Sequence, residues 1–218
     1  MKYALWLTAG ALAFAANGVA LGAEPATASA AKPDLAKAKQ TVDQICAACH
    51  GADGNSPSPA NPNLAGQQAS YITLQLQHFK SGVRNNPIMA GMVATLTPED
   101  MHALGIYFSQ QKPKAAGIRD RELALAGQKL FRGGNSESGL PACSSCHSPD
   151  GAGIPSRYPR LGGQHADYAL AQLKAFKAGE RGMDKGGKDT NGRVMSQVAA
   201  RLTDKEMQAL AQYASGLY

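Results

Sequence analysis

The four cysteines of the chain fall into two Cys-x-x-Cys-His groups, CAACH at 46–50 and CSSCH at 143–147. One helical turn places the two thiols of such a group along one side, with the adjacent imidazole close to anything bound there. This spacing is typical of c-type haem attachment, in which two thiols add to the haem vinyl groups and the His ligates the iron. The sequence therefore predicts two covalent haems, attached through Cys46, Cys49, Cys143 and Cys146, with His50 and His147 as iron ligands.

Two other sites use Cys-x-x-Cys pairs. A thioredoxin-like redox pair needs a βαβ context, and it does not need a His after the second Cys. A four-Cys zinc site normally pairs groups about 15 to 20 residues apart, whereas 93 residues separate Cys49 from Cys143. A purely structural zinc protein is therefore the weakest alternative.

The two groups belong to an internal duplication. An offset of 97 residues matches CAACHGADG to CSSCHSPDG and continues to Arg84 and Arg181, and an offset of 106 then matches Met89 to Met195 and Tyr107 to Tyr213. The second copy therefore carries a nine-residue insertion. Two homologous domains follow, at 32–112 and 121–218, joined by a polar linker at 113–120.

The periodicity of both copies predicts helices. Leu35, Ala38 and Val42 recur at helical spacing, and no segment alternates as a strand would. A middle helix is expected before Gly82 or Gly179, and a last helix after the Thr caps at Thr97 and Thr203. We expect an all-α fold of two tandem domains related by the duplication, each wrapped around a covalent haem that completes a thin core.

Four methionines recur in the duplication, and they are the candidates for the sixth iron ligand. Met101 and Met207 come four residues after the Thr caps, where an apolar side chain normally packs into the core. Met89 and Met195 precede those caps and are expected in loops, where a thioether can reach the haem, so they are the predicted ligands. Met92 is the alternative to Met89. The unmatched histidines are expected on the surface; they are His78, His102 and His165.

The amino terminus resembles an export signal. Lys2 precedes an uncharged stretch from Ala4 to Ala23, and small residues offer cleavage sites between 23 and 31. An uncleaved membrane anchor is the alternative, because about 20 apolar residues can span a bilayer. We expect residues 1–23 to be removed and the mature protein to be soluble in the periplasm.

Charge gives a modest indication of the partners. The 22 basic and 16 acidic side chains leave a net charge of +6 without the basic runs typical of nucleic-acid binding. Basic residues gather between Lys174 and Arg193, including Arg181, Lys185 and Lys188. This stretch is predicted to attract an acidic redox protein, and the charge is compatible with peripheral membrane association.

The tandem haem motifs and the phrases NLAGQ (63–67) and RLGGQHADY (160–168) resemble the bacterial dihaem cytochrome c4 family. The resemblance implies two class I cytochrome c folds packed about a pseudo-twofold axis. It also implies a periplasmic electron carrier between a membrane-associated donor and a terminal oxidase or similar acceptor, which is not itself an enzyme.

A second resemblance concerns Pro62 and Pro159, twelve residues after each motif His. In cytochromes c a proline carbonyl at this place accepts a hydrogen bond from the ligating imidazole, although an ordinary loop proline is the simpler alternative. The function also has alternatives. A dihaem cytochrome subunit of a larger dehydrogenase, for instance with a flavoprotein, shares this layout. An enzyme such as a dihaem peroxidase or sulfur-compound dehydrogenase would need an open sixth coordination position.

Overall fold

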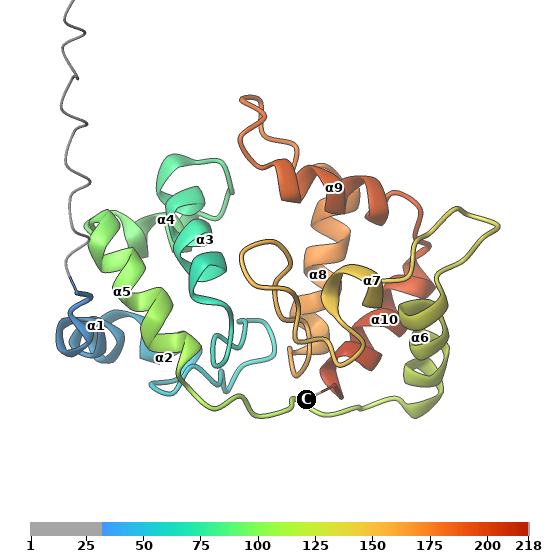
Figure 1. Cartoon of the computed structure of the whole chain (residues 1–218), viewed down its shortest axis with the longest axis horizontal. Helices are drawn as coiled ribbons and strands as arrows, with labels where there is room; N and C mark the ends of the chain where they lie inside the picture. Colours follow the sequence, from blue (N-terminus) through green and yellow to red (C-terminus); the bar gives the residue numbers. More distant parts are fainter. Residues whose placement is uncertain (1–31, 218) are drawn as a thin grey trace, which may run out of the picture. The chain divides into compact units, whose positions relative to one another are not determined.

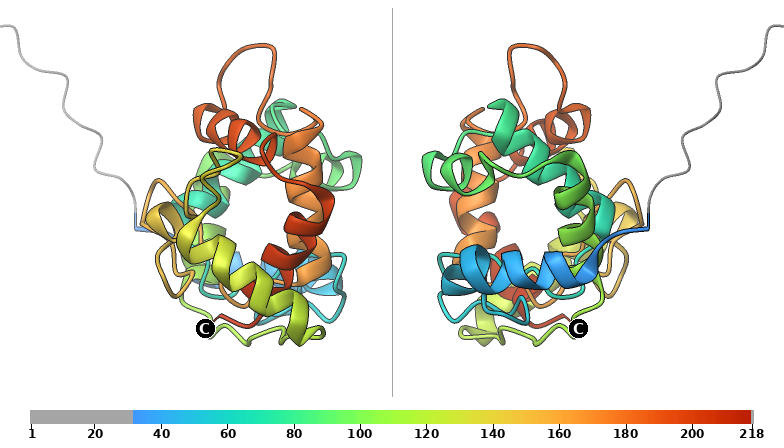
Figure 2. Two further views of the ribbon diagram at one scale, coloured as in Figure 1. Left: turned by 90° about the vertical axis from the view of Figure 1, so that its right-hand side faces the viewer. Right: turned by 90° about the vertical axis from the view of Figure 1, so that its left-hand side faces the viewer.

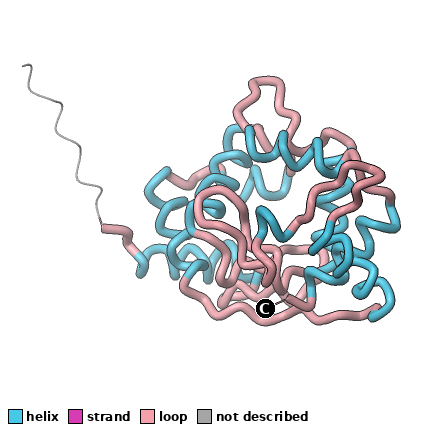
Figure 3. Tube along the Cα trace, turned by 45° about the vertical axis from the view of Figure 1, so that its right-hand side comes forward, coloured by secondary structure: helices cyan, strands magenta, loops and turns pink. Residues whose placement is uncertain are grey.

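The computed structural model describes residues 32–217, and contacts group Pro33 onward into one compact unit. The predicted export signal at 1–23 lies outside the described residues. Within residues 32–217 the structure is helical, with two isolated β-bridges and no strand (Figure 3). The predicted all-α fold class is confirmed. No helix in this part of the chain is long and apolar enough to cross a membrane.

The first half begins with α1 (Leu35–Thr41), which continues through a π-helical turn, η1 (Val42–Cys46), into α2 (Ala47–His50). The first haem motif therefore ends a continuous run of helix (Figure 1). A loop leads to α3 (Ala69–Ser81), α4 (Pro87–Val93) and α5 (Pro98–Ser109). Helix α3 packs against α5, and α5 packs against α1.

The second half repeats this order with one difference. Helix α6 (Arg121–Gly133) ends ten residues before Cys143, and the second motif forms a separate short helix, α7 (Ser144–His147). The remaining helices are α8 (Ala166–Lys177), α9 (Thr190–Ala199) and α10 (Asp204–Ser215). Figure 2 shows the matching crossings of α1, α3 and α5 in one half and of α6, α8 and α10 in the other.

The predicted helix ends are present in both copies. Thr97 and Thr203 form capping boxes with Asp100 and Glu206 at the starts of α5 and α10. Gly82 caps α3 in the left-handed conformation, as expected. The equivalent helix α8 is capped by Ala178, and Gly179 follows with a φ of 73°.

Each half has its own apolar core. Ile72, Leu104 and Phe108 belong to the first, and Phe131, Leu202 and Leu210 to the second. Met101 and Met207 are 2% and 1% exposed within these clusters, which confirms their predicted role in core packing.

The phrases NLAGQ and RLGGQHADY meet where the halves contact each other. Gln164 accepts from the Asn63 backbone N–H at 2.8 Å and donates to its carbonyl at 3.0 Å. Gln67 makes the same pair of bonds with the backbone of Arg160, both at 2.9 Å. Asn63 and Arg160 occupy equivalent positions in the two copies, so the two glutamines make equivalent hydrogen bonds. These four partly buried hydrogen bonds fix the register of the two halves.

Gly127 allows α6 and α10 to cross closely, since a Cβ there would lie 2.0 Å from the Ala209 carbonyl oxygen. We expect Gly127→Ala to lower the free energy of unfolding by about 1–3 kcal/mol, because neither backbone can move without disturbing the core. Gly133, at the end of the same helix, has nothing within 4 Å of its Cβ position. Gly133→Ala should raise stability by roughly 0.4–1 kcal/mol. Denaturant unfolding of the two variants measures both effects, and equal midpoints would contradict the prediction.

Candidate haem sites and the polar cluster between the halves

The two motif histidines have the same surroundings. His50 and His147 are buried, and Nδ1 of each lies 2.9 Å from a carbonyl oxygen twelve residues on, Pro62 for His50 and Pro159 for His147. A carbonyl can only accept a hydrogen bond, so Nδ1 carries the proton and the lone pair of the imidazole is on Nε2. This tautomer leaves Nε2 ready to bind a metal.

The pKa shifts of the two motif histidines also favour the neutral form of their imidazoles. Burial lowers the pKa of His50 and of His147 more than their hydrogen bonds to the proline carbonyls raise it. Both imidazoles are therefore neutral at neutral pH. Burial also raises the pKa of the Cys46 and Cys143 thiols to about 11. All four cysteines are free of disulfide bonds.

A cavity of about 260 Å³ lies beside the second motif, and residues of both halves line it, among them Asn63, Tyr71 and Gln75 of the first half. Cys143, Cys146 and His147 line one side of it, and Met195 also lines it from α9. Most of the remaining wall is apolar, and includes Phe131, Leu161, Leu173 and Val198. The predicted attachment and ligand residues of the second half therefore surround one apolar space.

In the first half, Cys46 and Met89 both pack against the apolar core. Met89 is half-buried, whereas Met92 is 45% exposed. Burial therefore favours Met89 over Met92 as the side chain directed inward.

The expectation that Met89 and Met195 lie in loops is wrong, because both lie on short helices. Met89 is in α4, which Asn86 caps by accepting a hydrogen bond from the Met89 N–H at 3.0 Å. Met195 is in α9, which Asp189 caps through the Gly192 N–H at 2.8 Å. Asn and Asp are strong N-caps, so these helices could have been found in the sequence.

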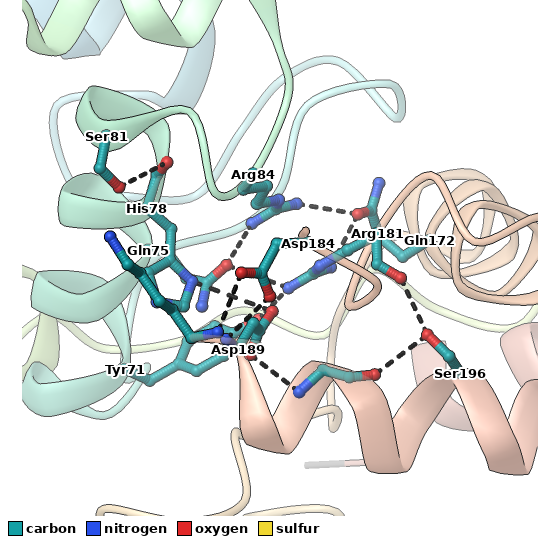
Figure 4. Close-up of polar contacts among 12 residues, drawn as sticks. Tyr71, Gln75, His78, Ser81, Arg84, Gln172, Arg181, Asp184, Asp189 and Ser196 are labelled. Carbon is teal, nitrogen blue, oxygen red and sulfur yellow. Dashed lines mark hydrogen bonds and ion pairs between the residues drawn. The ribbon is translucent and has the colours of Figure 1, made fainter. Parts of the chain in front are cut away.

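A cluster of polar side chains joins the halves above these sites (Figure 4). Arg84 donates to Gln75 of its own half at 2.8 Å and to Tyr168 and Gln172 of the other half at 2.9 and 2.8 Å. Its counterpart Arg181 repeats the pattern with the equivalent residues Gln172, Tyr71 and Gln75, at 2.7, 2.7 and 3.1 Å. Each guanidinium also stacks 4.5 Å from the ring centre of a phenylalanine, Phe79 or Phe176.

In the part of the chain that the structure describes, the guanidinium groups of this cluster have no carboxylate in direct contact, although the charge of Asp189 raises the pKa of Arg181 from a longer distance. Within residues 32–217, neither Arg84 nor Arg181 has a carboxylate within 4.0 Å, and Arg181 is buried with its Nε bonded to nothing. A buried cation without an anion is costly. Because Arg181, Gln75 and Gln172 also line the second cavity, they offer hydrogen bonds and charge to an acidic group bound there. A haem has two such groups, its propionates, and the donors of Arg181, Gln75 and Gln172 suit them, although the Asp189 carboxylate lines the same cavity.

A zinc site fits the structure less well. Within the described ranges, no three His, Cys, Asp or Glu side chains lie close enough together to hold a metal ion. A four-Cys site would require both motifs at one ion.

Two surface predictions are wrong. His78 is only 6% exposed and Arg181 only 7%, because both are enclosed where the halves meet. His102 is exposed as expected, and His165 is half-buried with Nε2 3.0 Å from the Ser56 carbonyl oxygen. The sequence contained one usable signal for this cluster, since its members recur in both copies as polar pairs; they are Tyr71 and Tyr168, Gln75 and Gln172, and Arg84 and Arg181.

Comparison with known proteins identifies the family. The sequence model of the cytochrome c family matches residues 35–112 and 124–217. Cytochrome c4 of Pseudomonas aeruginosa is 42% identical over 184 residues, which cover 84% of this chain and 89% of the relative. The chain belongs to the cytochrome c4 family. The crystal structure of reduced recombinant cytochrome c4 from Pseudomonas stutzeri superposes with a TM-score of 0.78 at 40% identity, over 86% of this chain and all of that one.

A further cytochrome c4-like relative is the "thiosulfate dehydrogenase electron acceptor" of Thiomonas intermedia. It is 40% identical over 205 residues, which cover 93% of this chain and 88% of the relative. As a member of the cytochrome c4 family, the chain carries two covalent haem c groups, one at Cys46 and Cys49 and one at Cys143 and Cys146. Its general function is electron transfer.

Proposed function

We propose that the chain is a periplasmic dihaem carrier that takes electrons from a membrane-associated donor and delivers them to a terminal oxidase or similar acceptor. The observation that carries this proposal is the matched environment of the two motif histidines, each with Nδ1 2.9 Å from a proline carbonyl. Haem iron, when bound, supplies a reversible one-electron couple. The protein residues around each haem meet the other requirements of an electron carrier.

The proposed axial ligands are His50 with Met89 in the first half and His147 with Met195 in the second. Pro62 and Pro159 hold the two imidazoles in the ligating tautomer and orientation. If one His and one Met held each iron, they would leave no coordination position for a substrate, so we propose a carrier without catalytic activity of its own. Met195 supports this assignment by sharing a cavity with His147.

The contact between the halves serves electron exchange. Gln67 and Gln164 fix the register, and Arg84 and Arg181 hold the polar cluster together. Because these bonds are shielded in part from solvent and reciprocal, they keep the two haem sites in one relative orientation during turnover. The proposed domains are 32–112 and 121–218, joined by the linker 113–120.

Two stretches of the sequence support the proposed location and the proposed docking surface. The apolar stretch 4–23 supports export to the periplasm. Lys174, Lys185, Lys188 and Arg193 are exposed in the second half and would attract an acidic partner.

A second candidate is the electron acceptor of a dehydrogenase. The relative from Thiomonas intermedia favours it, because the name of that protein assigns it this role with thiosulfate dehydrogenase. This candidate keeps the same haem sites and changes only the donor.

Oxidation and reduction assays with defined partners test the proposal. The ascorbate-reduced protein should be reoxidised by bacterial membranes that contain a cytochrome c oxidase, and cyanide should stop the reaction. Thiosulfate with a thiosulfate dehydrogenase should reduce the oxidised protein only if the second candidate is correct. A protein that exchanges electrons with neither system would contradict both assignments. Rising salt should slow the reaction with an acidic partner, because screening shortens the reach of charge to about 8 Å at physiological ionic strength.

A further inference from the structure

A buried histidine of the first half faces two carboxylates of the second. His78 lies on α3, and its Nδ1 is 3.9 Å from Asp189 Oδ2, with the two side chains 8% and 9% exposed. This distance is too long for a hydrogen bond, and His78 Nδ1 has no hydrogen-bond partner in the structure. Both oxygens of Asp184 and Oδ1 of Asp189 accept backbone N–H groups at 2.8 to 3.0 Å, whereas Asp189 Oδ2 is the oxygen that faces His78. His78 is therefore enclosed among charges without being locked by a bond (Figure 4).

Charges of both signs act on His78. Burial lowers its pKa, Asp189 and Asp184 raise it, and Arg181 and Arg84 lower it. Arg181 in turn donates a hydrogen bond to the Tyr71 hydroxyl, and the charge of Asp189 raises the pKa of Arg181. With the pKa below its ordinary value, His78 is neutral at neutral pH and gains a proton as the pH falls.

The same side chains reach the second haem cavity. Asp189 and Arg181 line that cavity together with His147 and Met195. Any change of charge in the cavity therefore acts on Asp189 and Arg181, and through them on His78, across a buried region where screening by water is weak.

We propose that His78 is a redox-linked proton site, which takes up a proton from solvent when an electron arrives at the second haem and releases it when the electron leaves. The electron comes from the donor of the carrier reaction, and the proton comes from water. An added electron makes the cavity more negative and raises the proton affinity of His78. By reciprocity, a proton on His78 favours the reduced state. One unit of charge at about 15 Å, at an effective dielectric constant of about 20, changes a proton affinity roughly sixfold.

The duplication makes this site one-sided. The position equivalent to His78 is Ala175, and Asp184 and Asp189 lie in the segment of the nine-residue insertion, between Arg181 and Met195. The first haem therefore has no equivalent of this group among the repeated residues. We expect the second reduction potential to fall more steeply than the first as the pH rises through the titration range of His78, because Asp189 and Arg181 line the second cavity. The inference rests on the proposed carrier function, because it needs reversible one-electron chemistry at the second site.

Potentiometric titration of the holoprotein from about pH 8 downward tests the proposal, and the pH dependence is expected below the ordinary His pKa of about 6.5, because burial lowers the pKa of His78. His78→Gln, which keeps a polar side chain and cannot titrate there, should lose the pH dependence. His102→Gln, which replaces an exposed histidine on α5, should retain it. Asp189→Asn keeps an N-cap for α9 but removes the charge that raises the His78 pKa. It should move the pH-dependent range to lower pH.

A second readout is the NMR titration of the His78 ring in the oxidised and reduced protein, where the reduced protein should bind the proton several-fold more tightly. An unchanged pH dependence in His78→Gln would overturn the proposal, as would equal pH dependence of both wild-type potentials. Failure of the proposed ligand set would be seen separately, as a Met195→Ala variant that keeps its full far-red absorption band.

Discussion

Replacing Cys143 and Cys146 together by Ala should leave a protein that carries one covalent haem instead of two. The mass should fall by one haem and the intensity of haem staining should halve, because no thiol remains in the second half to form the thioether bonds. The same variant should lose much of the structure of the second half. Cys143, Leu161, Leu173 and Val198 pack around both the second core and the cavity, so an empty cavity leaves this thin core without its filling.

The chain offers a matched control within the motif. The double variant Ser144→Ala and Ser145→Ala converts CSSCH into CAACH, the motif that the first half already uses. It should keep two haems and near wild-type stability. Mass measurement after denaturation separates the two variants. Retention of two covalent haems after loss of both cysteines would show that the second motif is not an attachment site.

Replacing Met195 by Ala should remove about half of the far-red band of the ferric protein and lower one reduction potential. This band is characteristic of Met-bound ferric haem, and a thioether ligand raises the potential relative to its absence. Met195 lines the second cavity with His147, and no other repeated methionine lines it. Met89→Ala should have the same effect on the other haem.

Met207→Ala is the stability control for this experiment. Met207 is 1% exposed in the second core, so its truncation should cost about 2–5 kcal/mol in the free energy of unfolding while the far-red band stays whole. Met92→Ala should affect neither property strongly, since that side chain is 45% exposed. A far-red band that survives Met89→Ala and halves in Met92→Ala would show that Met92 is the ligand.

The sequence by itself determined what is local and repeated. The attachment chemistry follows from the spacing of Cys46, Cys49 and His50, because three neighbouring side chains on one helical turn need no long-range information. The capping boxes at Thr97 and Thr203 and the core positions of Met101 and Met207 are local in the same sense. Each of these patterns occurs once in each copy. The sequence therefore predicts two similar all-α halves.

The helices that carry Met89 and Met195 were missed for a local reason. They are seven and ten residues long, and stretches this short have little helical periodicity. Their caps, Asn86 and Asp189, were the stronger signal, together with Pro87 in the first turn of α4.

Only the tertiary structure decided which polar residues are buried. Arg181 and His78 have the composition and spacing of solvated helix positions, yet the contact between the halves encloses both. The reason is that Arg84 and Arg181 each find two of their three acceptor residues 84 to 110 positions away in the other half, such as Tyr168 and Tyr71. A pattern within one copy carries no information about a partner surface supplied by the other. The approach of Asp189 to His78 depends further on the insertion present in the second copy, so this buried contact arises from the packing of the halves rather than from either repeat alone.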